Sequence, residues 1–493
     1  SGRTLTLPRR ALARPDETDI MTTYRLRTPV EATLQDQALW LQDTHSSAPS
    51  FEPLTERITA DVAIVGGGLT GLWTAIRLRQ THPELSVVVL EASTCGSGAS
   101  GRNGGQVHSW FERLDQLSAV VGDEEALRLA RASAEAIDEL RQLQEDRELD
   151  LGLRLDGWVW TASSRAQEGA WDEALARGAE VGEDSYSRLS ASDLAARVGP
   201  SASYVGVVEE RGGSLHPGRM MRSLARWADR LGVVIHEHPP VRSITDGARA
   251  RLVTDRATVD ADRVLVATNI WASSIPELRK RMFVVDSEVV ATAPIPDRLD
   301  ALGWRGGEAI CDAQQQVLYY QRTSDGRVVF GRGSGRTLFR DRVTAAFNRR
   351  PEGAPLAVAE LARVYPQLAD APIEYSWTGG IDCVPSHIPQ IGRLRGARSV
   401  FYAYGWNGTA LAQIPACSRI IAAMLAGDDD EWGRSRLIDQ PDPATLPPEP
   451  IRWIGANVVR WAVIRKNRAE IRNRRPGWFV RALIRFMPST SEH

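Results

Sequence analysis

The chain is poor in the features that mark several common classes of protein. Its 493 residues hold only four cysteines, with no CxxC pair, so we expect neither a disulfide framework nor a zinc site, and no other metal. The formal net charge of −2 lacks the cationic excess that a nucleic-acid partner requires. No apolar run is long enough for a spanning helix or a secretory signal. We therefore expect a cytoplasmic protein in a reducing compartment.

Lysine is almost absent, because Lys280 and Lys466 are the only two and arginine carries most of the positive charge. The composition is otherwise ordinary, with 43% hydrophobic and 25% charged residues. A chain of this length and composition can form two or three globular domains around a large core.

The segment 61–91 has the order of parts of a dinucleotide-binding unit. An apolar strand leads into a glycine-rich turn and a helix, and a second apolar strand ends in an acidic residue. Gly66, Gly68 and Gly71 have the GxGxxG spacing, which allows a tight turn, a close approach of pyrophosphate and close helix–strand packing. Glu91 stands where a carboxylate accepts hydrogen bonds from ribose hydroxyls. The pattern predicts a site for an adenine dinucleotide.

A second glycine-rich stretch, CGSGASGRNGGQVH at 95–108, follows the acidic residue directly. Its glycines let the backbone lie close to a ligand. Ser97, Ser100, Arg102 and Asn103 can hydrogen-bond to pyrophosphate, ribityl hydroxyls or the edge of a flavin. Its position favours a cofactor-binding loop over a flexible surface loop.

The remaining periodicity predicts an α/β fold with an inserted domain. Residues 113–149 and 217–231 have helical spacing of apolar residues, and Pro217 stands at the start of the second helix, where His216 is expected as a capping residue. Short strands with β-branched or aromatic residues are predicted at 153–161, 204–209, 282–293, 317–322 and 327–331. They indicate an antiparallel sheet in a second domain.

The chain returns to the dinucleotide domain several times, so each predicted domain is discontinuous. We expect a lead-in at 1–59, a dinucleotide-binding domain at 60–152, 204–275 and 371–427, a substrate domain at 153–203 and 276–370, a linker at 428–450 and a basic amphipathic helical tail at 451–493.

Five motifs together resemble the FAD-dependent amine and amino-acid oxidoreductases of the D-amino-acid-oxidase-like superfamily, and most closely its γ-glutamylputrescine oxidoreductase branch. They are VGGGLTGL at 65–72, LEA at 90–92, GASGRNGGQ at 98–106, ADRVLVATN at 261–269 and WTGGIDCVPSHIPQIG at 377–392. The resemblance implies a Rossmann-like FAD-binding domain, an inserted α+β substrate domain on an antiparallel sheet, and FAD as the cofactor.

The resemblance also implies where the cofactor lies. YGWNGTAL at 404–411 is similar to a late motif that meets the flavin from a helix N-terminus, where the N–H groups of Asn407, Gly408 and Thr409 would stabilise a reduced flavin. Val241 would offer its backbone to the adenine. The full set of predicted cofactor-binding residues is Gly66, Gly68, Leu69, Thr70, Gly71, Glu91, Ala92, Ser97, Ala99, Ser100, Arg102, Asn103, Gly104, Gly105, Gln106, Val241, Ala267, Thr268, Trp406, Asn407, Gly408 and Thr409.

For the substrate side the resemblance implies an amine whose C–N bond is oxidised by hydride transfer to flavin N5, giving an imine that water hydrolyses. The amine is a γ-glutamylated polyamine, a polyamine or an amino acid. The chemistry belongs to the flavin, so no catalytic triad is required. The candidate substrate-side residues are Gln106, His108, Tyr320, Arg322, Trp377 and Trp406, and for each of them ordinary packing is the alternative.

Two departures from related sarcosine oxidases bear on the cofactor and on oxygen. Cys383 does not align with their flavin-linking cysteine, so we expect noncovalent FAD. Their oxygen-activating lysine has no counterpart at 328–331, where the sequence reads VVFG. The electron acceptor is therefore oxygen or another acceptor, such as a quinone or a carrier at a membrane. A flavin-binding protein without turnover is a further alternative.

The segment 451–493 carries ten cations against Glu470 and Glu492, a local charge of +10 − 2 = +8, interleaved with tryptophans and aliphatic residues. This pattern is typical of a helix on an anionic membrane surface, which would place the protein peripherally on the inner face of the membrane. Packing against the body of the protein or a second subunit explains the pattern equally well.

Overall fold

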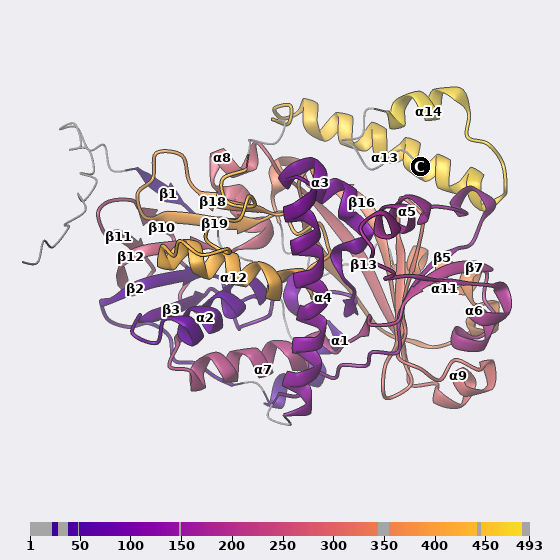
Figure 1. Cartoon of the computed structure of the whole chain (residues 1–493), viewed down its shortest axis with the longest axis horizontal. Helices are drawn as coiled ribbons and strands as arrows, with labels where there is room; N and C mark the ends of the chain where they lie inside the picture. Colours follow the sequence, from indigo (N-terminus) through magenta and orange to yellow (C-terminus); the bar gives the residue numbers. More distant parts are fainter. Residues whose placement is uncertain are drawn as a thin grey trace, which may run out of the picture.

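The computed structural model describes residues 22–27, 38–47, 49–146, 149–343, 354–440 and 445–485. The remaining residues, which include parts of the predicted lead-in, linker and tail, lie outside this description. The described chain is a mixed α/β structure built on two large sheets that lie side by side (Figure 1).

The first sheet has the strand order β1-β10-β11-β12-β2-β3-β9, and β19 also pairs with β12 and with β18. The pairs β12–β2, β2–β3, β3–β9 and β12–β19 are parallel. The strands are β1 (Thr23–Arg25), β2 (Ile58–Val65), β3 (Val87–Glu91), β9 (Val234–Glu237), β10 (Ser243–Thr245), β11 (Ala250–Val253), β12 (Thr258–Val266), β18 (Gln390–Arg393) and β19 (Val400–Tyr404). The buried residues of β2 and β3 form near-continuous apolar runs, as expected for parallel strands covered on both faces.

The second sheet has the order β17-β13-β16-β15-β14-β5-β7-β6. Its neighbouring strands are antiparallel except for β14 and β5. The strands are β5 (Trp158–Ala162), β6 (Ser187–Leu189), β7 (Val205–Glu209), β13 (Phe283–Thr292), β14 (Ala309–Asp312), β15 (Leu318–Arg322), β16 (Val328–Thr337) and β17 (Ile373–Cys383). Two further short strands, β4 (Gln106–Val107) and β8 (Gly213–Ser214), pair with each other in an antiparallel ribbon. Along the chain, β4 follows β3 of the first sheet and β8 follows β7 of the second.

Helices cover the sheets, and α2, α4, α7 and α12 flank the first one (Figure 1). The helices are α1 (Leu39–Asp43), α2 (Leu69–Thr81), α3 (Leu114–Val121), α4 (Asp123–Glu145), α5 (Asp172–Glu180), α6 (Ala191–Val198), α7 (Pro217–Arg230), α8 (Pro276–Arg279), α9 (Pro296–Leu302), α11 (Ala354–Val364), α12 (Gln413–Ala426), α13 (Ile451–Ile471) and α14 (Trp478–Ile484). The predicted helix at 217–231 is confirmed, with Pro217 at its first turn and His216 as its N-cap, where the imidazole accepts a hydrogen bond from Arg219 N–H.

Two segments lie in a different sheet from the one that their predicted domain bounds imply. Residues 204–209 were predicted as a strand of the antiparallel sheet, and this is confirmed because β7 pairs with β5 in the second sheet, but the predicted domain bounds had placed them in the dinucleotide-binding domain. Residues 373–383 were also expected there, but β17 pairs with β13 along the same sheet. In both places the chain crosses between the sheets, and apolar periodicity alone does not reveal which sheet a strand joins.

The tail packs onto the body of the protein. Helix α13 runs along the second sheet, beside β16, and α14 folds back over α13 (Figure 1). Ala462 and Val463 are buried on the inner side of α13, whereas Trp461 is 41% exposed on its outer side. One face of the tail is therefore part of the fold and the other is left open.

Candidate functional site

A cavity of about 730 Å³ lies between the two sheets. Its lining begins at the glycine-rich turn after β2 and continues past the loop at 96–108 to the facing side of the second sheet. We call it the central cavity. Parallel α/β sheets commonly bind ligands at the carboxyl ends of their strands, which is where this cavity starts.

The dinucleotide motif has the backbone that its glycines predict. Gly66 has φ +115°, and a Cβ there would lie 2.4 Å from the carbonyl oxygen of Ala267. A Cβ on Gly71 would lie 1.9 Å from the Gly66 oxygen, so Gly71 lets α2 approach the turn and does not itself line the cavity. The carboxylate of Glu91 accepts hydrogen bonds from the N–H groups of Gly67 (2.7 Å) and Ser93 (2.9 Å). Burial raises the pKa of Glu91.

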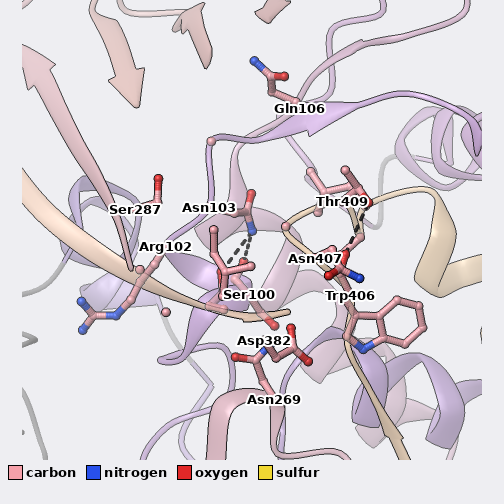
Figure 2. Close-up of a pocket in the computed structure, with 18 of the residues that line it drawn as sticks. Ser100, Arg102, Asn103, Gln106, Asn269, Ser287, Asp382, Trp406, Asn407 and Thr409 are labelled. Carbon is pink, nitrogen blue, oxygen red and sulfur yellow. Dashed lines mark hydrogen bonds between the residues drawn. The ribbon is translucent and has the colours of Figure 1, made fainter. Parts of the chain in front are cut away.

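The loop after β3 is held in place by its own polar side chains. Ser100 Oγ accepts a hydrogen bond from Leu69 N–H at 2.9 Å, and this bond ties the loop to the start of α2. Asn103 donates to the carbonyls of Ala99 and Ser100 and accepts from Gly105 N–H (Figure 2). These side chains shape the loop so that its backbone faces the cavity.

The buried side chain of Arg102 also holds this loop in place. It donates to the carbonyl of Ser97 at 2.9 Å and to that of Thr378 at 3.4 Å, and so joins the loop to β17. A Cβ on Gly105 would lie 2.3 Å from the Leu215 oxygen, so Gly105, like Gly71, is placed behind the lining rather than in it.

Most of the predicted cofactor-binding residues line the central cavity. They are Gly66, Gly68, Leu69, Thr70, Glu91, Ala92, Ser97, Ala99, Ser100, Arg102, Asn103, Gly104, Gln106, Val241, Ala267, Thr268, Trp406, Asn407, Gly408 and Thr409. They come from segments far apart in the sequence and meet at one surface.

The late motif differs from its prediction in one respect. Its residues line the cavity, but α12 begins only at Gln413, so Asn407, Gly408 and Thr409 form a turn before the helix. The N–H of Asn407 donates to the carbonyl of Asp382 and the N–H of Thr409 to that of Trp406. These two N–H groups are therefore already hydrogen-bonded within the protein. The prediction that 407–409 form the N-terminus of a helix was wrong.

Asp382 supports this turn from β17. Its carboxylate accepts a hydrogen bond from Gly405 N–H at 2.6 Å, and it lies beside Asn269 in the cavity wall (Figure 2). Because the side chain is only 1% exposed, burial raises its pKa to about 7.

The facing side of the second sheet differs from the prediction for Tyr320 and Arg322. Tyr319 lines the cavity, and its hydroxyl forms a 2.7 Å hydrogen bond with Ser287 Oγ. Tyr320 points to the opposite face of β15, where its ring stacks on Phe330. Arg322 shares that opposite face and pairs with Asp300 at 2.8 Å. Because neighbouring side chains of a strand point to opposite faces, Tyr319 and Tyr320 cannot both line the cavity, and the prediction that Tyr320 and Arg322 do so is wrong.

Trp377 is a second correction. Its side chain is 1% exposed, and Nε1 donates to the carbonyl of Arg102 at 2.9 Å, behind the flavin-type loop and outside the cavity lining. Gln106, His108 and Trp406 do line the cavity. His108 stacks on Trp158 with ring centroids 4.5 Å apart.

Several lining residues were not predicted from the sequence. They are Glu112, Arg113, Trp158, Ser287, Asp312, His387, Lys466 and Glu470. Burial and the nearby charge of Arg113 lower the pKa of His387 to about 4, so its imidazole is neutral at pH 7. His387 stands in the recognised segment 377–392 and could have been noticed there, whereas nothing in the sequence pattern connects the tail with the cavity.

The donor set fits an adenine dinucleotide that carries a flavin. Thr268 Oγ1 and Asn269 Oδ1 are buried in the wall and have no hydrogen-bond partner among the described residues, so a ligand would satisfy them. Gly68 leaves the space beside Ser100 open, since a Cβ there would lie 2.9 Å from Ser100 Oγ. Within the described ranges no cluster of side chains could hold a metal ion.

These features define a dinucleotide-binding α/β protein whose cofactor cavity is closed by a second sheet. The profile of the family described as FAD dependent oxidoreductase matches residues 61–424. The chain belongs to this family, and it is an FAD-dependent oxidoreductase.

Curated relatives span most of the chain. The γ-glutamylputrescine oxidoreductase of Escherichia coli is 29% identical over 385 residues, 78% of this chain and 87% of that protein. The probable oxidoreductase OrdL of Haemophilus influenzae is 27% identical over 399 residues, 79% of this chain and 88% of that protein.

Solved structures have the same fold at lower identity. Glycine oxidase from Geobacillus kaustophilus superposes with a TM-score of 0.62 at 21% identity, covering 76% of this chain and 96% of that one. L-proline dehydrogenase from P. horikoshii gives 0.64 at 17% identity over the same shares of the two chains. Across the described ranges, no helix combines the length and hydropathy that crossing a bilayer requires.

Proposed function

We propose that this enzyme oxidises the C–N bond of an amine, and that its substrate is a γ-glutamylated polyamine, a polyamine or an amino acid. The observation that carries the proposal is the central cavity itself. It joins the dinucleotide motif at Gly66 to a polar wall on the second sheet at Tyr319 and Ser287 without interruption. The similarity to γ-glutamylputrescine oxidoreductase supports an amine as the molecule that enters the second part.

The proposed binding residues are those that line the cavity. FAD is held noncovalently, with its ADP half near Gly66 and Glu91 and its ring near the loop at 96–108 and the late turn. Cys383 supports noncovalent binding because it is absent from the lining. Cys311 does line the cavity, but desolvation raises the pKa of its thiol well above the usual range, which disfavours the reactive thiolate.

Bound flavin supplies the acceptor for a hydride from the carbon next to the amine nitrogen, and water then hydrolyses the resulting imine. The chain's own residues bind the amine, orient it and exclude water. The indole rings of Trp158 and Trp406 are apolar parts of the lining that would exclude water from the reacting carbon. Neutral His387 adds no positive charge of its own to the cavity wall, where the ammonium group of the substrate must lose its proton before oxidation.

The electron acceptor is proposed to be a quinone or a carrier, with oxygen as the alternative. No lysine stands on β16, where Gly331 instead leaves room for the Tyr319 ring. Stopped-flow mixing of reduced enzyme with oxygen tests this choice. Slow reoxidation supports the dehydrogenase, and fast reoxidation with release of peroxide shows an oxidase.

If the enzyme is a dehydrogenase that passes electrons to a quinone or a carrier at a membrane, it would dock to that membrane. An exposed surface of the tail supports docking to an anionic membrane. We define the outer tail face as the exposed apolar residues Trp453, Ile454, Val458, Trp461, Trp478 and Phe479. The same part of the chain carries six exposed arginines, which are Arg468, Arg472, Arg474, Arg475, Arg481 and Arg485. Interfacial tryptophans among cations suit a surface of acidic lipids, and a second subunit is the alternative occupant.

Anaerobic mixing with a panel of amines tests the proposed reaction. We expect at least one of the polyamines, their γ-glutamyl conjugates or the D- and L-amino acids to bleach the flavin absorbance. An oxidised spectrum that persists with every compound would contradict an amine substrate and favour a flavin-binding protein without turnover.

A further inference from the structure

Helix α13 runs along the second sheet (Figure 1) and is held to the body of the protein by hydrogen bonds near both of its ends. Near its start, Arg452 donates to Asp341 at 2.6 Å and to the carbonyl of Met282 at 3.1 Å. Just beyond its end, Asn473 Oδ1 accepts a hydrogen bond from Arg165 N–H at 3.2 Å. The first anchor lies beside β13 and the second lies after β5, so the helix spans the edge of the second sheet.

Between these anchors, α13 contributes two charged side chains to the cavity lining. Lys466 and Glu470 are one helical turn apart, and Lys466 Nζ lies 3.1 Å from Glu470 Oε1. Their side chains are only 20% and 13% exposed. The lining also includes 166–170, which follow β5 and include part of the short helix that contacts α13, and 312–315 at and just after the end of β14.

The two charges belong to the inner face of the helix. Asn467 on the same turn is 5% exposed, and neither atom of its amide has a hydrogen-bond partner among the described residues. Arg465, by contrast, is exposed and lies over the ring of Trp461 at 4.5 Å on the outer side. Lys466 therefore faces the cavity on the inner side of α13, whereas Arg465 faces outward.

We propose that Lys466 and Glu470 bind the zwitterionic α-amino-acid end of the substrate, while its oxidisable amine lies at the flavin. In this arrangement Lys466 donates to the carboxylate and Glu470 accepts from the α-ammonium group. The inference rests on the proposed function, and it narrows the substrate to an amine whose far end carries both charges. A simple diamine has no carboxylate for Lys466.

The pair can open for such a ligand at little cost. An i,i+4 ion pair on a helix stabilises the protein only weakly, because the two side chains lose conformational freedom and water competes for them. A ligand that carries a carboxylate and an ammonium group replaces the single contact between Lys466 and Glu470. Its carboxylate accepts a hydrogen bond from Lys466, and its ammonium group donates one to Glu470. The partial burial of the two side chains strengthens those new bonds relative to a fully hydrated surface.

Isothermal titration calorimetry on the FAD-loaded enzyme tests the site with a compound that cannot be oxidised at a terminal amine. The probe is γ-glutamylethylamide, and N-ethylbutanamide has the same chain without the two charges. We expect Lys466→Met to weaken binding of the probe by about 10- to 100-fold, as expected for the loss of a hydrogen bond to a charged group. Arg465→Met removes a cation one residue away and should bind the probe as the wild type does.

Glu470→Gln separates the two roles. It should weaken binding of γ-glutamylethylamide but not of glutaric acid monoethylamide, which keeps the carboxylate and lacks the ammonium group. Equal affinity of the Lys466→Met variant and the wild type for the probe, or no binding of the probe to the wild type, would overturn the proposal. A failure of every amine to reduce the flavin would instead contradict the proposed function. The calorimetric test would still be valid, because it measures binding of the probe and does not depend on flavin reduction.

Discussion

The Nε1 of Trp158 donates a hydrogen bond to Oε1 of Gln106 at 3.1 Å, and this bond connects the flavin-type loop to the second sheet. The same Gln106 side chain donates from Nε2 to the carbonyl of Ile310 at 2.7 Å. Both ends of one amide are thus used to fix the separation of the two walls of the central cavity. Gln106 acts on the cavity by positioning rather than by offering a free polar group.

Replacing Gln106 by leucine should destabilise the protein by about 1–3 kcal/mol, because the Trp158 indole and the Ile310 carbonyl lose their partner in a buried place. Urea unfolding of the FAD-loaded enzyme measures this change. The control Gln80→Leu alters an exposed glutamine on α2 and should stay within about 0.5 kcal/mol of wild type. Equal effects of the two changes on the free energy of unfolding would show that the hydrogen bonds of Gln106 to Trp158 and Ile310 do not stabilise the protein.

Gly71→Ala should yield a folded protein that retains little flavin. A Cβ there would meet the Gly66 oxygen at 1.9 Å, so the turn under the pyrophosphate must move. The ratio of flavin to protein absorbance after gel filtration measures retention. Gly455→Ala is the matched control, since a Cβ there meets no atom within 4 Å, and it should keep the wild-type ratio. Full flavin content in the Gly71 variant would show that this approach is not needed.

Asp382→Asn should change how stability depends on pH. Burial raises the pKa of Asp382 to about 7 from an ordinary value of 3.8, so above about pH 4 the unfolded chain releases a proton that the folded protein keeps. The carboxyl therefore lowers stability progressively as pH rises from about 4 to 7, and adds no further change above that range.

The asparagine variant lacks this loss, so relative to wild type it should gain stability between pH 4 and 7, by up to about 1.4 kcal/mol per pH unit. Thermal unfolding across this range measures the difference. Asp229→Asn, which removes an exposed carboxyl on α7, should stay within about 0.5 kcal/mol of wild type throughout. A constant difference between the Asp382 variant and wild type would contradict the raised pKa.

Trp478→Ala combined with Phe479→Ala should reduce binding to anionic vesicles. These side chains are 75% and 52% exposed on the outer tail face, where they can enter the lipid interface. Flotation with phosphatidylglycerol and phosphatidylcholine vesicles measures binding, and neutral vesicles should bind less. Val234→Ala combined with Leu356→Ala removes two exposed apolar side chains outside the tail and should leave binding unchanged.

Wild-type protein that does not float with anionic vesicles would exclude the membrane as the partner of this face. A change from dimer to monomer in the tail variant by analytical ultracentrifugation would instead identify a second subunit as its occupant.

The sequence was most informative where a tight turn and a strand end fix the path of the backbone. Gly66, Gly71 and Glu91 could be assigned because a tight turn and a strand end leave few alternatives for their spacing. Tyr319 and Tyr320 show the opposite case, because alternation separates their faces but only the packing of Phe330 and the partner Ser287 decides which one meets the cavity.

Lys466 marks the limit of prediction from sequence for this chain. It stands more than 350 residues after the loop at 96–108 in a tail with the composition of a membrane-binding helix, and no local pattern distinguishes it from Arg465. Its place in the cavity depends on the anchors of α13 at Arg452 and Asn473, which are contacts between distant segments. Such contacts leave no periodic signal in the sequence.

The most direct test of the account is the anaerobic reduction of the enzyme-bound flavin by one equivalent of γ-glutamylputrescine, followed by analysis of the product. We predict that the flavin absorbance bleaches and that an aldehyde and ammonia form in equal amounts, with slower bleaching when the carbon next to the amine carries deuterium. Oxidised flavin that persists with this compound and with every other amine of the panel would contradict the proposed oxidation of a C–N bond.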